Sequence, residues 1–277
     1  MGTDKRARQK ANRDRARQDR IRKQKLNKVR KRGILIGVGI PAIIGVLFLI
    51  SNFVMNDSSD APIELSASST PEPTETVPGR QITGKTPCPK TDGTEVRATI
   101  FEQAPPMCID PAKSYTATFN TSEGVIEVAL DTKKTPETVN NFVTLSRYGY
   151  YDTSFIFRTD VSLDIIQGGG SNNTDGPGYT IKDEGGRFSY SAGDLVMARS
   201  SGVDSGGGQF FFVTGEKAAV LNSQGTYVTF GKITKGLDVA QAILALNSGE
   251  GDLGGAPSKP VKIDTLVITE NEGFWAS

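Results

Sequence analysis

The sequence predicts a mainly β fold, a closed β-barrel capped by two helices, preceded by a single transmembrane helix and a disordered tether. Three observations support this prediction. Residues 33–55 contain no charged side chain, residues 56–85 are rich in Ser, Thr, Pro and Glu, and short β-type runs with glycine-rich loops follow residue 113. We divide the 277 residues into a basic tail 1–32, a transmembrane span 33–55, a linker 56–85, a cysteine-containing extension 86–112 and a folded domain 113–277.

The basic tail and the uncharged span together predict a membrane anchor. Residues 1–32 hold fifteen Lys and Arg against three Asp, a net charge of +12, and the rest of the chain carries −11. At ~1.5 Å rise per residue, a helix from Gly33 to Ser51 is about 28 Å long, close to the ~30 Å of a bilayer core. Because the basic tail directly precedes the span, we expect a single-pass protein with a cytoplasmic N-terminus and an extracytoplasmic folded domain.

Two alternative interpretations of the N-terminal region are less favoured. A cleavable signal peptide usually has a shorter apolar core, and no clear small-x-small cleavage site accompanies residues 33–55. Nucleic-acid binding by residues 1–32 is the other alternative, but anionic lipid headgroups beside the span account for their charge. We therefore expect the chain to contact the membrane through residues 33–55 and expect no nucleic-acid partner.

The linker and the two cysteines are typical of an extracytoplasmic segment. Residues 56–85 have almost no large apolar side chain, so they cannot bury enough surface to offset the entropy lost on ordering. Cys88 and Cys108 follow, and two cysteines outside the cytoplasm most simply form one disulfide, which contributes about 3 kcal/mol for a loop of this length. A redox pair would usually read Cys-x-x-Cys, and a zinc site would need further ligands.

The folded domain alternates β-type and helical patterns. The β-type runs Tyr115–Thr121 and Val125–Leu130 flank Ser-Glu-Gly, which predicts a hairpin. Thr135, Pro136 and Glu137 then provide an N-cap, a proline at the first helical position and an acid in the first turn. A second helix is predicted at Leu237–Leu246, and further strands at Asp194–Arg199, Gln209–Thr214, Tyr227–Thr234 and Val261–Thr269.

The residue types exclude most catalytic machinery. The chain has no histidine, which removes the Ser-His-Asp and Cys-His arrangements and the commonest zinc ligand. The glycine runs at 168–170 and 206–208 lack the Gly-Lys-Ser/Thr ending of a phosphate loop and do not form the dinucleotide-binding pattern. Arg158, Gln167 and Gln209–Phe212 remain, and these residues can bind and polarise an amide but cannot attack it. We expect no metal and no cofactor.

Seven segments, taken in order, resemble the cyclophilins, a family of peptidyl-prolyl cis-trans isomerases. The resemblance covers about residues 115–270 and implies an eight-stranded antiparallel barrel. The basic tail, single span, polar tether and two cysteines resemble in their arrangement the membrane-anchored cyclophilins of actinobacteria. The matching segments are TPETVNNFVTL at 135–145, YYDTSFIFR at 150–158, IIQGG at 165–169, GPGYTIKDE at 176–184, GDLVMAR at 193–199, QFFFVT at 209–214 and YVTFGKITKGLDV at 227–239.

The resemblance implies isomerisation of Xaa-Pro bonds in extracytoplasmic proteins, which assists their folding. Arg158 would stabilise the lone pair of the prolyl nitrogen as the amide twists, and Gln167 and Gln209 would hydrogen-bond the substrate backbone. Ala198 would line a neighbouring groove, with the backbone of Arg199 available for pairing. The proline ring would occupy an apolar pocket, for which the matching positions are Ile165, Phe211, Leu221 and Tyr227.

Several positions depart from the family pattern and motivate an alternative function. Phe157 stands where a histidine usually precedes the catalytic arginine, Val220 matches a position that is often tryptophan in eukaryotic members, and Tyr227 replaces a pocket histidine. One additional residue separates the arginine from the first glutamine, so Leu163 or Asp164 replaces an aromatic residue. The alternative is a weakly active or inactive cyclophilin-fold module that binds proline-containing peptides.

Overall fold

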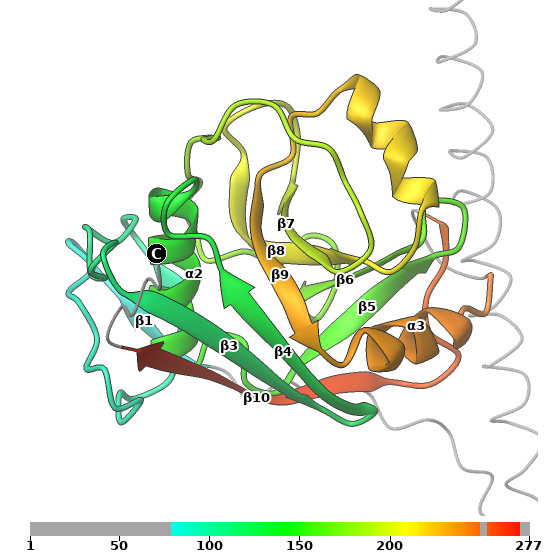
Figure 1. Ribbon diagram of the computed structural model, residues 1–277. Coiled ribbons are helices and arrows are strands. Elements are labelled where there is room, and N and C mark those ends of the chain that lie inside the picture. The colour runs from blue at the N-terminus through cyan, green and yellow to red at the C-terminus, as the bar shows by residue number, and fades with distance from the viewer. Residues whose placement is uncertain (1–78, 250–253, 272–277) are drawn as a thin grey trace, which may run out of the picture. The chain divides into compact units, whose positions relative to one another are not determined.

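The computed structural model describes residues 79–249 and 254–271, drawn in colour in Figure 1. The predicted basic tail, the predicted span 33–55 and most of the predicted linker lie outside the described residues. Among the residues that are described, no helix has the length and apolar character needed to cross a bilayer.

Eight strands close into a barrel in the order β10-β3-β4-β9-β7-β8-β6-β5, and β5 pairs with β10 to complete it. Every neighbouring pair is antiparallel, which confirms the predicted closed eight-stranded barrel. Closure leaves none of these strands with an unpaired edge. The strands are β3 (Ser114–Thr121), β4 (Gly124–Leu130), β5 (Ser154–Asp160), β6 (Ile165–Gly170), β7 (Asp194–Arg199), β8 (Gly206–Val213), β9 (Thr229–Lys235) and β10 (Val261–Asn271).

The predicted hairpin of β3 and β4 is confirmed, with pairing that runs from Tyr115 opposite Leu130 to Thr121 opposite Gly124. In β3, alternate residues such as Tyr115 and Phe119 are buried, at 1% and 0% exposure. This period of two follows from the pleat, which directs successive side chains to opposite faces of the sheet. The same alternation places the functional residues of β8 on the outer face of the barrel.

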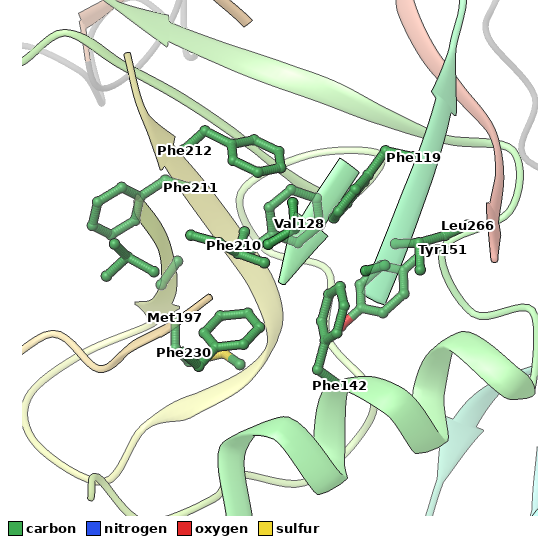
Figure 2. Close-up of a cluster of buried hydrophobic side chains, with 14 of the residues drawn as sticks. Phe119, Val128, Phe142, Tyr151, Met197, Phe210, Phe211, Phe212, Phe230 and Leu266 are labelled. Atoms are coloured by element: carbon green, nitrogen blue, oxygen red, sulfur yellow. The ribbon is translucent and has the colours of Figure 1, made fainter. Parts of the chain in front are cut away.

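Aromatic rings fill the barrel interior, as Figure 2 shows. The α-helices α2 (Pro136–Arg147) and α3 (Leu237–Ala245) cover the two ends (Figure 1). Phe142 of α2 enters the cluster, with its ring centroid 6.0 Å from that of Phe119. Phe210 and Phe212 of β8 lie 5.3 and 5.1 Å from Phe119 in the same cluster. Phe211, between them in the sequence, therefore points out of the barrel (Figure 2).

The N-terminus of α2 begins where predicted but is capped by a different side chain. Thr135 occupies the cap position, but its side chain makes no capping bond and instead donates to the Asp131 carbonyl at 3.0 Å. The carboxylate of Glu184 accepts hydrogen bonds from the backbone N–H groups of Glu137 (3.2 Å) and Thr138. An anion at this end of a helix satisfies its unpaired donors and interacts favourably with its dipole. Thr135, Pro136 and Glu137 thus have the predicted positions, but the capping hydrogen bonds come from Glu184, a residue distant in sequence.

Ahead of the barrel, residues 79–112 form an ordered segment, which we call the extension. Its strand β1 (Arg80–Ile82) pairs in parallel with β2 (Ala98–Phe101). β1 falls inside the range 56–85 expected to be a tether, and the folded part thus begins before residue 86. Cys88 and Cys108 form a disulfide with their Cα atoms 5.3 Å apart, which confirms the predicted pairing.

Candidate active site

The three strands β5, β6 and β8 place an arginine, a glutamine and a phenylalanine side by side. Arg158 of β5 lies opposite Gln167 of β6, and Gln167 lies opposite Phe211 of β8. Residues directly opposite in neighbouring strands project from the same face of a sheet. Because Phe211 points out of the barrel, this row lies on its outer surface. The site thus follows from strand register alone, before any side-chain contact is considered.

Hydrogen bonds join the polar side chains into one network. Arg158 Nη1 donates to Gln167 Oε1 at 2.8 Å, and Gln167 Nε2 donates to Gln209 Oε1 at 2.9 Å. Gln209 Nε2 in turn donates to the backbone oxygens of Asp175 and Asn172, at 2.7 and 3.1 Å. A guanidinium can only donate, so the arginine fixes which end of each amide is oxygen and which is nitrogen.

The remaining hydrogen-bonding capacity differs between the two glutamines. A side-chain amide has two N–H donors and an oxygen with two lone pairs. Gln209 uses both N–H groups on backbone oxygens, which leaves one oxygen lone pair for a ligand. Gln167 uses one N–H and one lone pair, which leaves one of each. A bound peptide can therefore receive a hydrogen bond from Gln167, whereas Gln209 can only accept one while this network persists.

Asp160 extends the network and was missed by the sequence analysis. Its Oδ2 lies 2.8 Å from Arg158 Nη2, while its Oδ1 accepts from the backbone N–H and the hydroxyl of Ser162, at 3.0 and 2.6 Å. Burial opposes ionisation, but the hydrogen bonds from Ser162 and Arg158 outweigh it and lower the pKa of Asp160 below its usual range. The available signal was the i, i+2 spacing of two opposite charges on one strand, which puts both on one face. We call Asp160, Arg158, Gln167 and Gln209 the polar network.

Of the apolar residues of the predicted pocket, Tyr227 packs on the outward-facing phenylalanine. Phe211 is 4% exposed, and its ring centroid lies 5.8 Å from that of Tyr227 in an edge-to-face arrangement. Ile165 is buried in β6, two residues from Gln167 and hence on the same face. Leu221 lies on a short 3-10 helix, η1 (Lys217–Ser223), and packs half-buried against the core.

The positions that depart from the family pattern have distinct surroundings. Leu163 packs against the core, whereas Asp164 adopts a left-handed φ of 51° and places its Oδ1 2.8 Å from Lys217 Nζ. Leu163 is therefore the residue that supplies apolar surface where the aromatic residue is missing. Val220 is 62% exposed on η1. Phe157 lines a separate hollow of about 270 Å³ that lies against Pro257 and neighbouring residues.

A groove of about 770 Å³ lies beside the polar network. Ala198, Arg199 and Gln209 line it together with residues of the loop 173–180. The side chain of Arg199 is only 6% exposed, with Nη1 3.3 Å from Asp183 and its guanidinium 4.6 Å from the centre of the Tyr227 ring. Arg199 thus joins the groove to the apolar pocket through its side chain, in addition to the backbone expected from the sequence.

Sequence comparisons show which known proteins the chain resembles. Residues 116–268 match the family model "Cyclophilin type peptidyl-prolyl cis-trans isomerase/CLD". The chain is 35% identical to peptidyl-prolyl cis-trans isomerase A of Dickeya dadantii over 53% of this chain and 81% of that protein. It is 40% identical to peptidyl-prolyl cis-trans isomerase B of Bacillus subtilis, over 46% of this chain and 85% of the relative.

Among solved structures, the chain is similar to a cyclophilin-type peptidyl-prolyl cis-trans isomerase of Cryptosporidium parvum crystallised in the presence of the dipeptide Ala-Pro. The sequence identity is 27%, the TM-score is 0.47, and the match covers 56% of this chain and 99% of the other. The family match covers more than half of the present chain, and the two bacterial relatives are matched over most of their lengths. The chain belongs to the cyclophilin-type peptidyl-prolyl cis-trans isomerase family.

Proposed function

We propose that the folded domain isomerises Xaa-Pro bonds of extracytoplasmic proteins, and so assists their folding, with Arg158 as the group that stabilises the twisted amide. The observation that carries this proposal is the polar network, which fixes a permanent positive charge next to the apolar surface of Phe211. A proline ring needs apolar surface, and its twisted amide needs a cation. The outer face of β5, β6 and β8 offers both within one row of residues.

The chemistry needs no covalent step. Rotation about a peptide bond crosses a barrier of ~18–20 kcal/mol because the nitrogen lone pair is delocalised into the carbonyl. In the twisted amide this lone pair is localised on nitrogen, where a guanidinium stabilises it more than it stabilises the planar ground state. A barrier lowered by about 7 kcal/mol corresponds to roughly 10⁵-fold acceleration.

The two glutamines then have different parts in substrate binding. Gln167 holds the guanidinium through its oxygen and has one N–H left for a substrate carbonyl. Gln209 accepts from a substrate N–H, and its own N–H groups stay on the loop 172–175. Phe211, Tyr227 and their neighbours exclude water from the proline ring, which strengthens the interaction between the cation and the lone pair.

The extracytoplasmic location is supported by sequence and disulfide together. The uncharged residues 33–55 follow a tail of net charge +12, and lysine and arginine beside a span favour the cytoplasmic side. Disulfides persist mainly in oxidising compartments, and Cys88 is bonded to Cys108. We therefore propose a single-pass membrane protein whose isomerase domain acts on newly secreted or membrane-inserted chains.

A protease-coupled assay of the full-length protein in detergent, with an Xaa-Pro tetrapeptide, tests the proposal. Arg158→Ala should lower kcat/KM by about 10²- to 10³-fold, the usual loss when one preorganised donor is removed. Arg158→Lys should retain part of the activity, because the charge remains while the fork geometry is lost. Lys235→Ala, which removes an exposed cation that pairs with Glu127 on the barrel surface, is the control and should leave the rate unchanged.

The same assay separates the enzyme from a second candidate, a module that binds proline-containing peptides with little turnover. The exposed Val220 favours this candidate, since that position then offers little wall to the proline pocket. Wild-type and Arg158→Ala rates that both equal the uncatalysed rate, with peptide binding retained, would support the binding module and contradict the proposed mechanism.

A further inference from the structure

We propose that the extension at residues 79–112 adds a second binding hollow to the groove, so that the enzyme binds a longer extended polypeptide than the Xaa-Pro core. This inference rests on the function proposed above and deepens it by naming the substrate class. The occupant is an extended segment of the same unfolded chain that carries the proline.

The hollow, of about 180 Å³, lies where β2 meets the end of β6, and we call it the side hollow. Thr99 and Ile100 of β2 form one wall, and Gly169 and Gly170 of β6 are part of the other. Asp175 and Gly176 line both the side hollow and the groove beside Gln209. The two depressions therefore adjoin at these residues, and a chain that leaves the groove there lies next to the extension.

Tyr150 gives the side hollow a hydrogen-bond donor that no described residue uses. The residue is 6% exposed and lines the hollow, yet its hydroxyl makes no hydrogen bond with any other residue in 79–249 or 254–271. Burial raises the pKa of Tyr150 far above its usual range, so the hydroxyl keeps its proton. The hydroxyl oxygen is not one of the fully enclosed, unpartnered side-chain atoms of the described residues, so a ligand in the side hollow can reach this hydroxyl. A backbone carbonyl of an extended substrate would satisfy it.

The apolar wall of the side hollow suits a side chain of the same segment. Ile100 is 43% exposed although it belongs to a paired strand. Arg97 also lines the hollow and donates to the carbonyls of Gly149 and Asp152, at 3.0 and 2.8 Å, which holds its aliphatic stem in place. An extended polypeptide presents carbonyls and side chains about every 3.4 Å, which matches a wall that combines a donor with apolar surface.

The extension is fixed to the groove, so the two depressions keep their spacing. The Phe101 N–H donates to the Pro177 carbonyl at 2.7 Å. Gly178, with φ of +99°, approaches the Phe101 carbonyl so closely that an added Cβ would lie 2.6 Å from its oxygen. The Phe101 ring packs on Tyr148 and Tyr179, with centroids 5.4 and 6.3 Å away. A preorganised pair of sites loses less entropy when a long ligand binds than two mobile ones.

The test compares two peptides on the full-length protein in detergent. One is an Xaa-Pro tetrapeptide, and the other is the same core extended by about six residues on each side, enough to reach roughly 20 Å. Binding of labelled peptides is measured by fluorescence anisotropy, which does not require turnover. We expect the long peptide to bind the wild type about tenfold more tightly than the short one.

Two variants and a matched control show which residues give the long peptide its higher affinity. Tyr150→Phe removes only a hydroxyl, and Ile100→Asp changes an exposed side chain. Each should weaken binding of the long peptide about two- to tenfold, the worth of one hydrogen bond or one apolar contact, and leave tetrapeptide turnover unchanged. Val125→Asp is the control, since Val125 is 39% exposed on β4 and lines neither depression.

Equal affinity of the wild type for both peptides would overturn the inference. The inference would also be overturned if the long peptide still bound more tightly than the short one after both substitutions; we call this difference in affinity the length advantage. Lack of tetrapeptide turnover by the wild type is a different failure, because it contradicts the proposed catalytic function while anisotropy still reports on the side hollow. Circular dichroism melting of each variant shows whether the fold is intact. Loss of the length advantage in the folded Tyr150→Phe protein supports the inference whatever the behaviour of Ile100→Asp.

Discussion

Replacement of Asp160 by asparagine would test whether this carboxylate positions Arg158. The substitution keeps the size of the side chain and one oxygen acceptor but removes the negative charge. The side chains of Arg158 and Asp160 are only 16% and 7% exposed, so solvent screens their interaction weakly. A hydrogen bond to a charged group contributes about 1.5–3 kcal/mol and a neutral one about 0.5–1.5 kcal/mol. The unfolding free energy should therefore fall by roughly 1–2 kcal/mol.

The same change should slow catalysis because the guanidinium loses the charged partner of one of the bonds that orient it. If about 1 kcal/mol of that loss appears in the transition state, kcat falls about fivefold, with little change in KM. The assay is tetrapeptide isomerisation at several substrate concentrations, with Asp264→Asn as a control for loss of a carboxylate that is exposed on β10. A rate that stays the same or rises would refute the reasoning, since the carboxylate would then act mainly by cancelling the positive charge.

The pH dependence of stability gives a second test of the interaction between Asp160 and Arg158. The folded pKa of Asp160 is lowered by its hydrogen bonds, so its stabilising contribution is present above the unfolded pKa of about 3.9. The contribution is lost as the pH falls through the lower, folded pKa. Urea unfolding should therefore show a constant difference between wild type and Asp160→Asn at about pH 5–8 and a shrinking difference below about pH 4. A difference that does not shrink would contradict the ionised pair.

Three further predictions concern the fold and the rate. Joint replacement of Cys88 and Cys108 by serine should lower the unfolding free energy by up to about 3 kcal/mol in urea titrations, and an unchanged midpoint would contradict this. Glu184→Gln should destabilise α2 by about 1 kcal/mol in thermal melts without a change in tetrapeptide turnover, whereas a loss of turnover alone would contradict a capping role. The catalysed rate should be flat between about pH 5.5 and 9, since the chain has no histidine, and a bell-shaped profile would contradict the mechanism.

The barrel was predictable where the pattern that specifies an element is local. Strand β7 was expected at Asp194–Arg199 and has those bounds, and the β3–β4 hairpin agrees because alternating burial and a short polar turn lie within one stretch of sequence. β1 was not predicted, since Arg80–Ile82 follow a low-complexity segment and gain order only by pairing with β2. The signal for such a strand lies in its partner, about eighteen residues away by the register.

The residues of the candidate site were likewise predictable only in part. Arg158 and Gln167 were identified from the order of motifs, and the structure joins them by a hydrogen bond. Asp160 was overlooked because a single carboxylate near an arginine has no distinctive local pattern, and its burial depends on the folded barrel. The roles of the glutamines also needed coordinates, because the count of unused donors depends on the backbone oxygens that Gln209 contacts.

The polar network ends on a loop outside the barrel, and the extension helps to hold that loop in position. Its last bonds are those from Gln209 to the backbone oxygens of the loop 172–175, and that loop is fixed by the bond from the Phe101 N–H to the Pro177 carbonyl. If the loop moved away, Gln209 would lose partners for both of its N–H groups, and its amide could turn toward solvent. Gln167 would then lose the acceptor that fixes its orientation toward Arg158. The arginine comes from the barrel, but its alignment depends in part on a strand that precedes the barrel in the sequence.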